Sequence, residues 1–338
     1  MTLSYIDLSP IPYGGNRTSA LQDTIETAQF IEDLGFKRIW LAEHHNAANF
    51  AGRVPEVVIP IVADRTKHIR VGSGAVLLNH YSPFKVAEVF STLTELFPGR
   101  IDLGIGRATT GPYSDLALQR NRSSRQTTDD SMEQLEELLH WFTDDFPKDH
   151  AFSQVKVYRD EAPEFYLLGS SSWSARAAAQ LGLAYAFSGF INPSAAYDTT
   201  QWYKGTFQPN NKLYGRSRPY LILSISVYAG ETDELALRLS APMQQYMRDL
   251  YRKGQINEPL KPEDEAVRLL GNNTSLQRLT DPTNFPKHII GKASTVAREL
   301  KEIAKTIGVD EFMIQPMTAN HAGKLKSMEL LTRALDNV

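Results

Sequence analysis

Two histidines and a glutamate follow one short apolar run, and this group is the clearest candidate for acid–base chemistry in the chain. The run Arg38–Ala42 is typical of a buried strand, and Glu43, His44 and His45 come directly after it. An imidazole titrates near neutral pH, so His44 could take up or release a proton during catalysis. Successive residues of an extended chain point to opposite sides, so we expect at most one of the two histidines to face a site.

A structural role for these residues is an open alternative. One imidazole would then hold the following loop, and Glu43 would pair with an arginine or lysine of the core. Adjacent histidines make a poor metal pair, because two-histidine metal sites on a helix take them one turn apart. We therefore predict no metal site, and a metal-dependent hydrolase that uses His44 and His45 stands as a separate alternative.

A second group of residues has the composition of an anion site. The segment Gly169–Ser171 follows a predicted strand at Phe165–Leu168, and an alanine-rich helix is expected from Ser174. Free backbone N–H groups and the helix dipole at such a turn favour a phosphate. The alternative is ordinary capping of the helix by the side chain of Ser172 or Ser174.

Arg107 ends the preceding predicted strand, Ile101–Gly106, which should lie beside the serine turn. Its guanidinium could bind the same phosphate through two hydrogen bonds. Alternatively, it could pair with an acidic residue of a nearby loop, such as Asp115. Gly104 and Gly106 do not form a dinucleotide-binding fingerprint, because no helix opens directly after them.

Two further segments could contact a ligand. Gly291–Thr295 precedes a helix and is a rival anion site, but we expect it at the opposite end of the fold, with Ser294 as a helix cap. Phe190 follows a predicted strand at Ala184–Phe187 and is better placed to contact a ring or a substrate than the other aromatic residues.

These groups need a scaffold that brings several strand ends together, and the order of elements supplies one. Short apolar runs alternate with helical patterns, which indicates parallel strands joined by helices. The eight predicted strands are Leu3–Leu8, Arg38–Ala42, Ile69–Leu78, Ile101–Gly106, Phe165–Leu168, Ala184–Phe187, Leu221–Tyr228 and Phe312–Gln315. Eight such units favour a closed (β/α)8 TIM barrel, whose site lies at the carboxyl ends of its strands.

One segment interrupts the alternation. Residues 253–286 are polar and rich in proline, and we interpret them as an insertion between strands seven and eight. The whole chain, residues 1–338, is then one barrel domain.

Composition excludes several classes of protein. The chain has 338 residues, no cysteine and a net charge of −3, so thiolate catalysis, disulfides and cysteine-bound metals are excluded. No basic stripe suggests nucleic acid, and no apolar run reaches the ~18 residues of a membrane span. The first residues do not have the pattern of a secretion signal, so we expect a cytoplasmic protein.

Taken together, the motifs resemble the bacterial luciferase-like flavin monooxygenases along nearly the whole chain. The segments that carry the resemblance are Ser4–Asp7, Glu43–His45, Val71–Ala75, Pro98–Arg107, Gly169–Ser171, the helix at Ile290–Gly291 and the eighth strand. By position, the resemblance implies that His44 is catalytic and that Arg107, Gly169, Ser170, Ser171 and Ser174 bind the flavin phosphate. It also implies that Gly74 and Ala75 support the flavin ring, in some members through a cis peptide bond. Glu43 and Phe190 are the predicted substrate contacts.

The resemblance further implies reduced FMN as co-substrate, molecular oxygen as oxidant and a small organic substrate. A flavin reductase would supply the reduced FMN, and a homodimer would form through the helices beside the second and third strands. The loop at residues 108–112 and the insertion do not match the luciferase subunit, so a long aldehyde substrate and light emission are not expected. A deazaflavin-dependent oxidoreductase and a non-catalytic FMN-binding protein are the alternatives on the same fold.

Overall fold

The structure is a computed structural model and describes the chain except residues 109, 120–128, 255–257, 272–275 and 338. Its strands are β1 (Leu3–Asp7), β2 (Arg38–Leu41), β3 (Arg70–Ser73), β4 (Val76–Leu77), β5 (Ile101–Gly106), β6 (Glu164–Gly169), β7 (Ala184–Ser188), β8 (Leu221–Gly230), β9 (His288–Lys292) and β10 (Glu311–Ile314). Its α-helices are α1 (Arg17–Asp33), α2 (Pro55–Arg65), α3 (Pro83–Leu96), α4 (Pro112–Leu118), α5 (Ser131–Thr143), α6 (Ser172–Leu181), α7 (Ala196–Thr206), α8 (Asp233–Lys253), α9 (Glu263–Leu270), α10 (Ala293–Ile307) and α11 (His321–Asp336).

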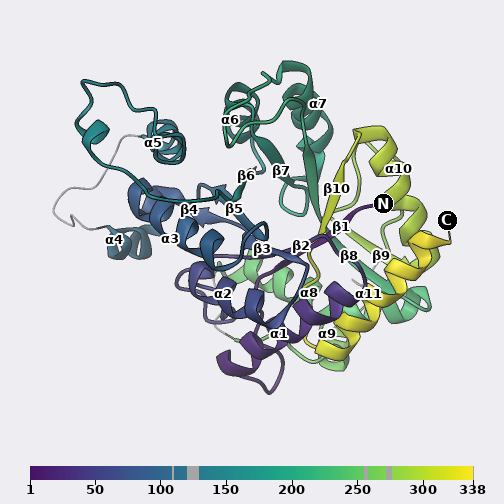
Figure 1. Cartoon of the computed structure of the whole chain (residues 1–338). Coiled ribbons are helices and arrows are strands. Elements are labelled where there is room, and N and C mark those ends of the chain that lie inside the picture. The colour runs from purple at the N-terminus through teal and green to yellow at the C-terminus, as the bar shows by residue number, and fades with distance from the viewer. Residues whose placement is uncertain (109, 120–128, 255–257, 272–275, 338) are drawn as a thin grey trace.

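The strands close into a parallel barrel with the helices around it (Figure 1). The order around the barrel is β1-β2-β3-β5-β6-β7-β8-β10, and β10 pairs with both β8 and β1. The short strand β4 continues β3 and pairs with the same neighbour, β5. The predicted (β/α)8 barrel is therefore confirmed. Because its strands are parallel, all their carboxyl ends lie at the same rim.

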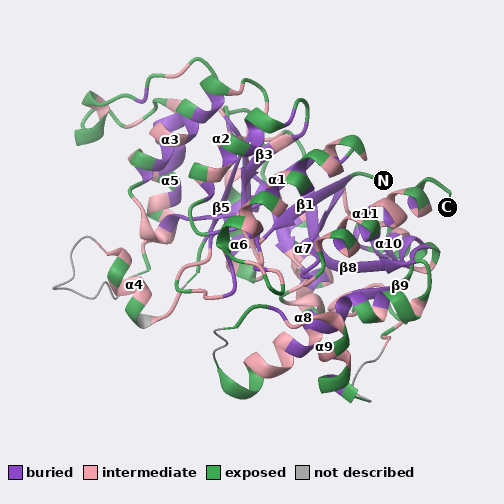
Figure 2. Cartoon of the chain, turned by 90° about the horizontal axis from the view of Figure 1, so that it is seen from below, coloured by how far each residue is buried: buried purple, intermediate pink, exposed green. Residues whose placement is uncertain are grey.

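Side chains of the strands alternate between the barrel interior and the helical shell, as a strand requires. On β8, Ile222 packs in the interior, whereas Leu221 and Leu223 pack in the outer core with the helices. The interior layer consists of Ile6, Trp40, Tyr166, Ala184, Ala186, Ile222 and Met313. Viewed by burial, the strands form the buried centre, and the helices expose their outer faces (Figure 2).

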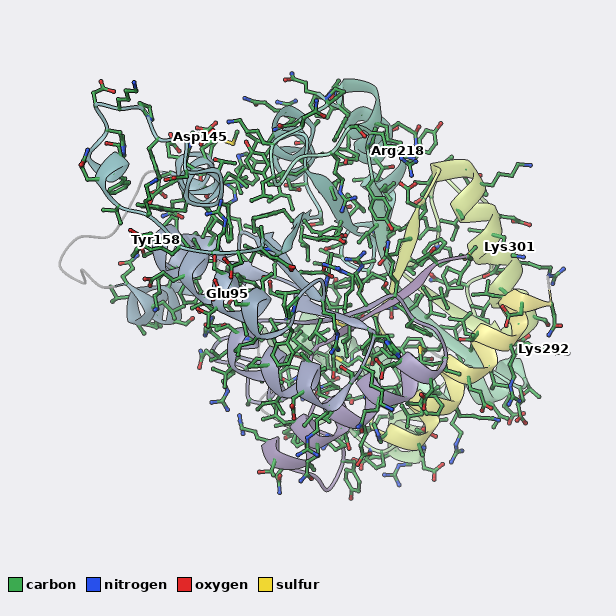
Figure 3. All side chains as sticks on the ribbon, in the orientation of Figure 1. Glu95, Asp145, Tyr158, Arg218, Lys292 and Lys301 are labelled. Carbon is green, nitrogen blue, oxygen red and sulfur yellow. The ribbon has the colours of Figure 1, made fainter. Side chains whose placement is uncertain are left out.

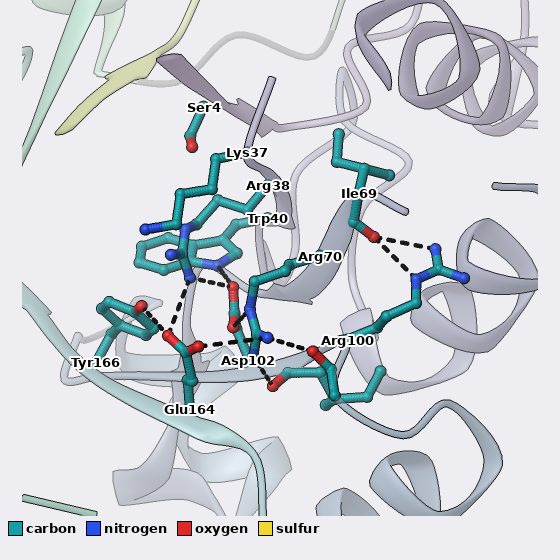
Figure 4. A network of polar contacts seen from close by, with 12 residues as sticks. Ser4, Lys37, Arg38, Trp40, Ile69, Arg70, Arg100, Asp102, Glu164 and Tyr166 are labelled. Atoms are coloured by element: carbon teal, nitrogen blue, oxygen red, sulfur yellow. Dashed lines mark hydrogen bonds and ion pairs between the residues drawn. The ribbon is translucent and has the colours of Figure 1, made fainter. Parts of the chain in front are cut away.

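Below this layer, the amino end of the barrel is filled by buried ion pairs (Figure 4). The Arg38 side chain has no exposed surface, and its guanidinium lies 2.6 Å from Asp102 and 2.8 Å from Glu311. The Trp40 indole N–H donates to Asp102 at 2.9 Å. These contacts leave both carboxylates paired within the protein, which is the condition for burying charge at acceptable cost.

A second set of contacts closes the same end. Arg70 donates to the other oxygen of Asp102 at 2.7 Å, and the Tyr166 hydroxyl donates to Glu164 at 2.5 Å. Arg216 lies 3.2 Å from Glu164. The amino end is thus packed with polar groups that mostly pair with one another, although Nη2 of Arg38 has no partner among the described residues. The cavity that could hold a ligand lies at the carboxyl end.

The third predicted strand, Ile69–Leu78, is shorter and interrupted in the structure. Strand β3 ends at Ser73, and β4 begins at Val76. The peptide bond between Gly74 and Ala75 is cis. The interruption turns these two residues toward the carboxyl rim.

The insertion lies between β8 and β10, as predicted, although residues 255–257 and 272–275 are outside the described part. It contains α9, which the sequence analysis did not predict, and it is followed by β9, which pairs in parallel with the second half of β8. Lys292 lies opposite Gly230 at the end of that pair, so the start of α10 is on the carboxyl side of the strands. The prediction that Gly291–Thr295 lies at the opposite end was wrong, because a helix that leads into a barrel strand starts at the carboxyl rim.

That segment is still not an anion site of the barrel. Lys292 lies at the periphery of the molecule (Figure 3), and its backbone N–H donates to Asp233 at 2.7 Å. The predicted cap is also absent, since no side chain caps the first turn of α10. Among the described residues, no helix is both long and apolar enough to cross a membrane.

Candidate active site

A cavity of about 450 Å³ opens at the carboxyl ends of the barrel strands. It is bordered by every site residue that the sequence predicted: Glu43, His44, Gly74, Ala75, Arg107, Gly169, Ser170, Ser171, Ser174 and Phe190. These residues come from segments up to 147 positions apart in the chain, between 43 and 190. Closure of the barrel brings them together, because each follows or ends a parallel strand.

His44 is a buried, uncharged imidazole at the wall of this cavity. Burial, with a smaller contribution from His45, lowers the pKa of His44 to about 4. Its Nδ1 is buried without a hydrogen-bond partner in the described structure. Near neutral pH the ring therefore carries one proton, so one of its nitrogens donates and the other accepts.

Both histidines border the cavity, which corrects the expectation that at most one would. That expectation assumed an extended chain, but β2 ends at Leu41 and the chain turns at His45 and Asn46. Asn46 has a φ of 52°, in the left-handed region. The alternation of side chains therefore does not continue past the strand.

Glu43 is held by protein groups on both of its oxygens. Oε1 accepts from the Tyr81 hydroxyl at 2.6 Å and lies 2.5 Å from Nε2 of His45, and Oε2 accepts from the Leu77 N–H at 3.0 Å. The predicted arginine or lysine partner was wrong, because a tyrosine, a histidine and a backbone amide take its place. These contacts tie β4 to the end of β2 and favour a supporting role for Glu43.

Arg107 lies over the start of α6. Its guanidinium carbon is 4.3 Å from the centre of the Trp173 ring, and its side chain is 36% exposed. It pairs with the exposed Asp129, so the alternative of an ion pair with a nearby acidic residue holds, with Asp129 in the place of Asp115. Stacking on an aromatic ring leaves the edges of a guanidinium free to donate, which suits recognition of an oxyanion.

The serine turn presents an open helix start to the same cavity. Ser171 is the residue before α6, and no side chain caps the first turn. The Ser174 hydroxyl points elsewhere, donating to the Ser171 carbonyl at 2.9 Å and lying 3.0 Å from the Tyr185 hydroxyl. The capping alternative is therefore wrong, and the first N–H groups of α6 keep their capacity to bind an anion.

Two glycines are required by close approach at the cavity wall. A Cβ at Gly169 would lie 2.6 Å from Cβ of Ser174, and a Cβ at Gly74 would lie 2.8 Å from Cβ of Trp40. Either contact is closer than packed carbon atoms allow, so any larger residue would displace the turn or the strand end.

Three bordering or adjacent residues escaped the sequence analysis. Trp173 stacks on Arg107, and Ser224 borders the cavity from β8. Phe50 packs against the His44 ring with centres 4.9 Å apart, and its other side meets Tyr246 of α8 at 6.4 Å. The serine could have been found from the pattern of β8, where a hydroxyl occupies a position expected to face the barrel interior.

Away from the cavity, Asp23, Glu26 and His321 lie close enough together to share a metal ion. The neighbouring Lys324 is 4% exposed, and burial lowers its pKa. An ammonium group at that position opposes a second cation. His44 and His45 do not join a metal-binding group in the described structure.

Comparison with known proteins finds relatives of one family along nearly the whole chain. Residues 1–311 match the family model described as luciferase-like monooxygenase. A luciferase-like monooxygenase of Escherichia coli is 34% identical over 336 residues, covering 98% of this chain and 96% of that protein. The N-acetyl-S-alkylcysteine monooxygenase of Bacillus subtilis is 33% identical over 342 residues, covering 98% of each chain.

Solved structures agree on the fold. The crystal structure of apo-MsnO8 matches with a TM-score of 0.87 and 34% identity over 100% of this chain and 98% of that one. The FMN complex of a 3,6-diketocamphane monooxygenase of Pseudomonas putida matches with a TM-score of 0.70 and 20% identity, covering 98% and 97%. An F420-dependent secondary alcohol dehydrogenase matches with 0.66 and 13%, covering 99% and 98%, so the fold alone does not distinguish the two cofactors.

Proposed function

Because the chain belongs to the luciferase-like monooxygenase family, we propose that it binds reduced FMN in the barrel cavity and uses molecular oxygen to oxidise a small organic substrate. The observation that carries the proposal is the meeting of Arg107, the open start of α6, Gly74–Ala75 and His44 at one cavity. Arg107 and the start of α6 would bind a phosphate, and Gly74–Ala75 would lie against an aromatic ring. His44 would transfer a proton.

The donor set at the rim fits the phosphate of FMN. The Arg107 guanidinium would supply charge-assisted hydrogen bonds, and the N–H groups at Ser171 and beyond would bind from the helix start. Gly169 allows the turn to pack closely against Ser174. We assign Arg107, Gly169, Ser170, Ser171 and Ser174 to this group, with Ser174 shaping the turn through its bonds to Ser171 and Tyr185.

The neighbouring part of the wall, at the end of β3, would carry the flavin ring. Gly74 and Ala75 border the cavity through a backbone without bulky side chains, so a flat ring could approach closely. Bound reduced FMN would supply the electrons that activate oxygen. The apolar wall residues around it exclude water from that chemistry.

His44 would hold or move a proton at this wall. Its low pKa, caused by burial, means that the imidazole stays neutral across the physiological range. It therefore acts as a hydrogen-bond donor and acceptor, and not as a standing cation. We assign His44 as the catalytic residue, while Phe190 remains our proposed substrate contact and Glu43 positions His45.

The direct test is titration with oxidised and reduced FMN, with and without oxygen. We expect reduced FMN to bind and oxygen to be consumed, with product formed in the presence of a substrate. The probe panel should include an N-acetyl-S-alkylcysteine, which the Bacillus subtilis relative oxidises according to its name. Tight binding without turnover would instead indicate a flavin-storage protein, and reaction only with a reduced deazaflavin would indicate a hydride-transfer enzyme.

Partners follow from the same proposal. A separate flavin reductase would supply reduced FMN, and the enzyme would work in the cytoplasm as a homodimer. In support of a dimer, Val57 and Ile61 of α2 and Val54 just before it are exposed apolar side chains, at 59%, 46% and 40%. Exposed apolar side chains that lie together favour association. Replacing Val57 and Ile61 with Asp should yield a monomer in sedimentation analysis, and an unchanged mass would contradict this interface.

A further inference from the structure

The cavity wall divides into two arcs of neighbouring strands. The residues proposed for FMN and proton transfer follow β2, β3, β5 and β6, which are adjacent in the barrel. Strands β7 and β8 lie next along the barrel and contribute Ser188, Phe190, Ile191 and Ser224 to the same cavity. This second arc has no assignment in the flavin site.

We propose that the hydroxyls of Ser188 and Ser224 form a paired anchor for the neutral polar group, such as an amide or ketone carbonyl, of a small substrate. The proposal rests on the function proposed above and specifies its substrate class. It assigns β7 and β8 to substrate recognition.

The two serines are neighbours because β7 and β8 pair directly. Ser188 and Ser224 are Cα partners in the parallel pairing of β7 with β8. Each is the next inward position above an interior residue, because Ala186 and Ile222 face the barrel centre two residues earlier. Both hydroxyls are thus expected on the same level of the cavity wall.

Neither hydroxyl makes a hydrogen bond to another described residue, and neither belongs to the fully buried polar atoms without a partner, so both are open to the cavity. Ser224 is 2% exposed, and it borders the cavity. A hydroxyl at a cavity wall without a protein partner is free to bond a ligand, and a carbonyl that enters the cavity can accept from it. Barrel interiors of this kind are usually filled by Val, Ile and Leu, so two adjacent serines there indicate polar recognition.

The surroundings select a neutral group. Phe190 and Ile191 follow Ser188 directly and add apolar surface to this arc. Arg107, the arginine of the described lining, belongs to the other arc and is proposed to hold the phosphate. Two hydroxyls can donate to one carbonyl oxygen, but a carboxylate placed there would lose its hydration without gaining a cation.

Three small probes of similar length test this selection: hexanamide, hexanoate and 1-chlorohexane. Binding is followed by the change in visible absorbance of the FMN-loaded protein, and by calorimetry on the protein without FMN. We expect hexanamide to bind about tenfold more tightly than either other probe. In the double variant Ser188→Ala, Ser224→Ala this preference should disappear, while the affinity for FMN stays within about twofold.

Ser226→Ala is the matched control. Ser226 is also a buried serine of β8 with an unpartnered hydroxyl, but it does not border the cavity. The control variant should keep the preference for hexanamide, and thermal unfolding should show that each variant is folded. Each single variant, Ser188→Ala or Ser224→Ala, should lose part of the preference.

Two results would overturn the proposal. In one, the double variant keeps the preference for hexanamide, or the unmodified protein has none. In the other, the double variant loses affinity for FMN about tenfold, which would assign the serines to the flavin ring. If the unmodified protein fails to bind FMN but the calorimetric preference persists and depends on both serines, the function proposed above fails while the anchor stands.

Discussion

The two ends of the barrel use polar residues in opposite ways. At the amino end, Arg38 has no exposed surface and is paired at 2.6 Å with Asp102 and at 2.8 Å with Glu311. At the carboxyl end, Nδ1 of His44 is buried without a partner, and the Ser224 hydroxyl makes no hydrogen bond to another described residue and borders the cavity. The two ends therefore differ in the surroundings of their polar groups. At the amino end these groups mostly pair with one another and hold the barrel, with Nη2 of Arg38 as the exception, whereas those beside the cavity can bond a ligand.

The two arginines show the same contrast. Arg38 lies between carboxylates and above aromatic rings in the interior, 4.7 Å from the centre of the Tyr166 ring. Arg107 stacks on Trp173 and is 36% exposed. An arginine whose partners are all internal cannot respond to a ligand, whereas one at a cavity rim can exchange a surface partner for a phosphate.

The largest effect is expected at the amino end. Replacing Arg38 with Met leaves Asp102 and Glu311 as buried charges with fewer partners, so the free energy of unfolding should fall by about 3–5 kcal/mol. Urea unfolding measures the loss, and Arg218→Met on the surface is the control. A loss below about 1 kcal/mol would mean that the network does not hold this end of the barrel.

The next effect concerns the carboxyl end and should spare stability. His44→Ala should lower turnover by about a hundredfold while FMN binding stays nearly unchanged, because the imidazole is assigned to proton transfer. Single-turnover kinetics and FMN titration measure the two quantities, with His68→Ala on the surface as control. Turnover equal to that of the unmodified protein would remove His44 from the mechanism.

Arg107→Ala should separate phosphate recognition from ring recognition. We expect affinity for FMN to fall about tenfold to thirtyfold, because a charge-assisted contact is lost. Riboflavin lacks the phosphate, so its affinity should change little. Arg53→Ala controls for the loss of one surface charge, and an equal loss of riboflavin affinity would show that Arg107 acts on the fold instead.

The smallest effect is a pH dependence of stability. Burial lowers the pKa of His44 and of His288 to about 4 in the folded chain, whereas an exposed imidazole titrates near 6.5. Unfolding therefore takes up protons between these values, so stability should fall as pH falls from about 6.5 toward 4. The expected slope is about 1 kcal/mol per pH unit for each imidazole.

Urea unfolding at pH 6 and pH 5 measures this slope, and His288→Leu should reduce it by about 1 kcal/mol per pH unit. His44 and His321, whose pKa values burial also lowers, contribute to the remainder. A slope that does not change in the variant would show that His288 is already protonated in the folded protein.

The barrel and its rim were predictable because both follow from local patterns. Alternating apolar runs and helices predict parallel strands, and the residues after each strand, such as His44 and Arg107, then meet at one end. The buried network around Arg38 was not predictable, because its partners Asp102 and Glu311 are 64 and 273 residues away. Charged residues inside predicted strands were the available signal for it.

Other errors had local causes. The interruption at Gly74–Ala75 lies inside one continuous apolar run, so periodicity alone predicts a single strand. Helix α9, Glu263–Leu270, has only eight residues and lies within a polar segment rich in proline. Its apolar periodicity is too short to distinguish it from a loop. The side on which His45 points depended on a turn at Asn46, whose left-handed conformation strand periodicity does not reveal.

The position of Phe50 matters for chimeras that combine segments of related proteins. The Phe50 ring packs near both His44 and Tyr246 of α8, with centres 4.9 Å and 6.4 Å away. The imidazole and the helix that leads into the insertion therefore share one packing partner. A chimera that imports a foreign α8 and insertion should carry the matching residue at position 50 with it, or the imidazole will lose the surface that fixes its orientation.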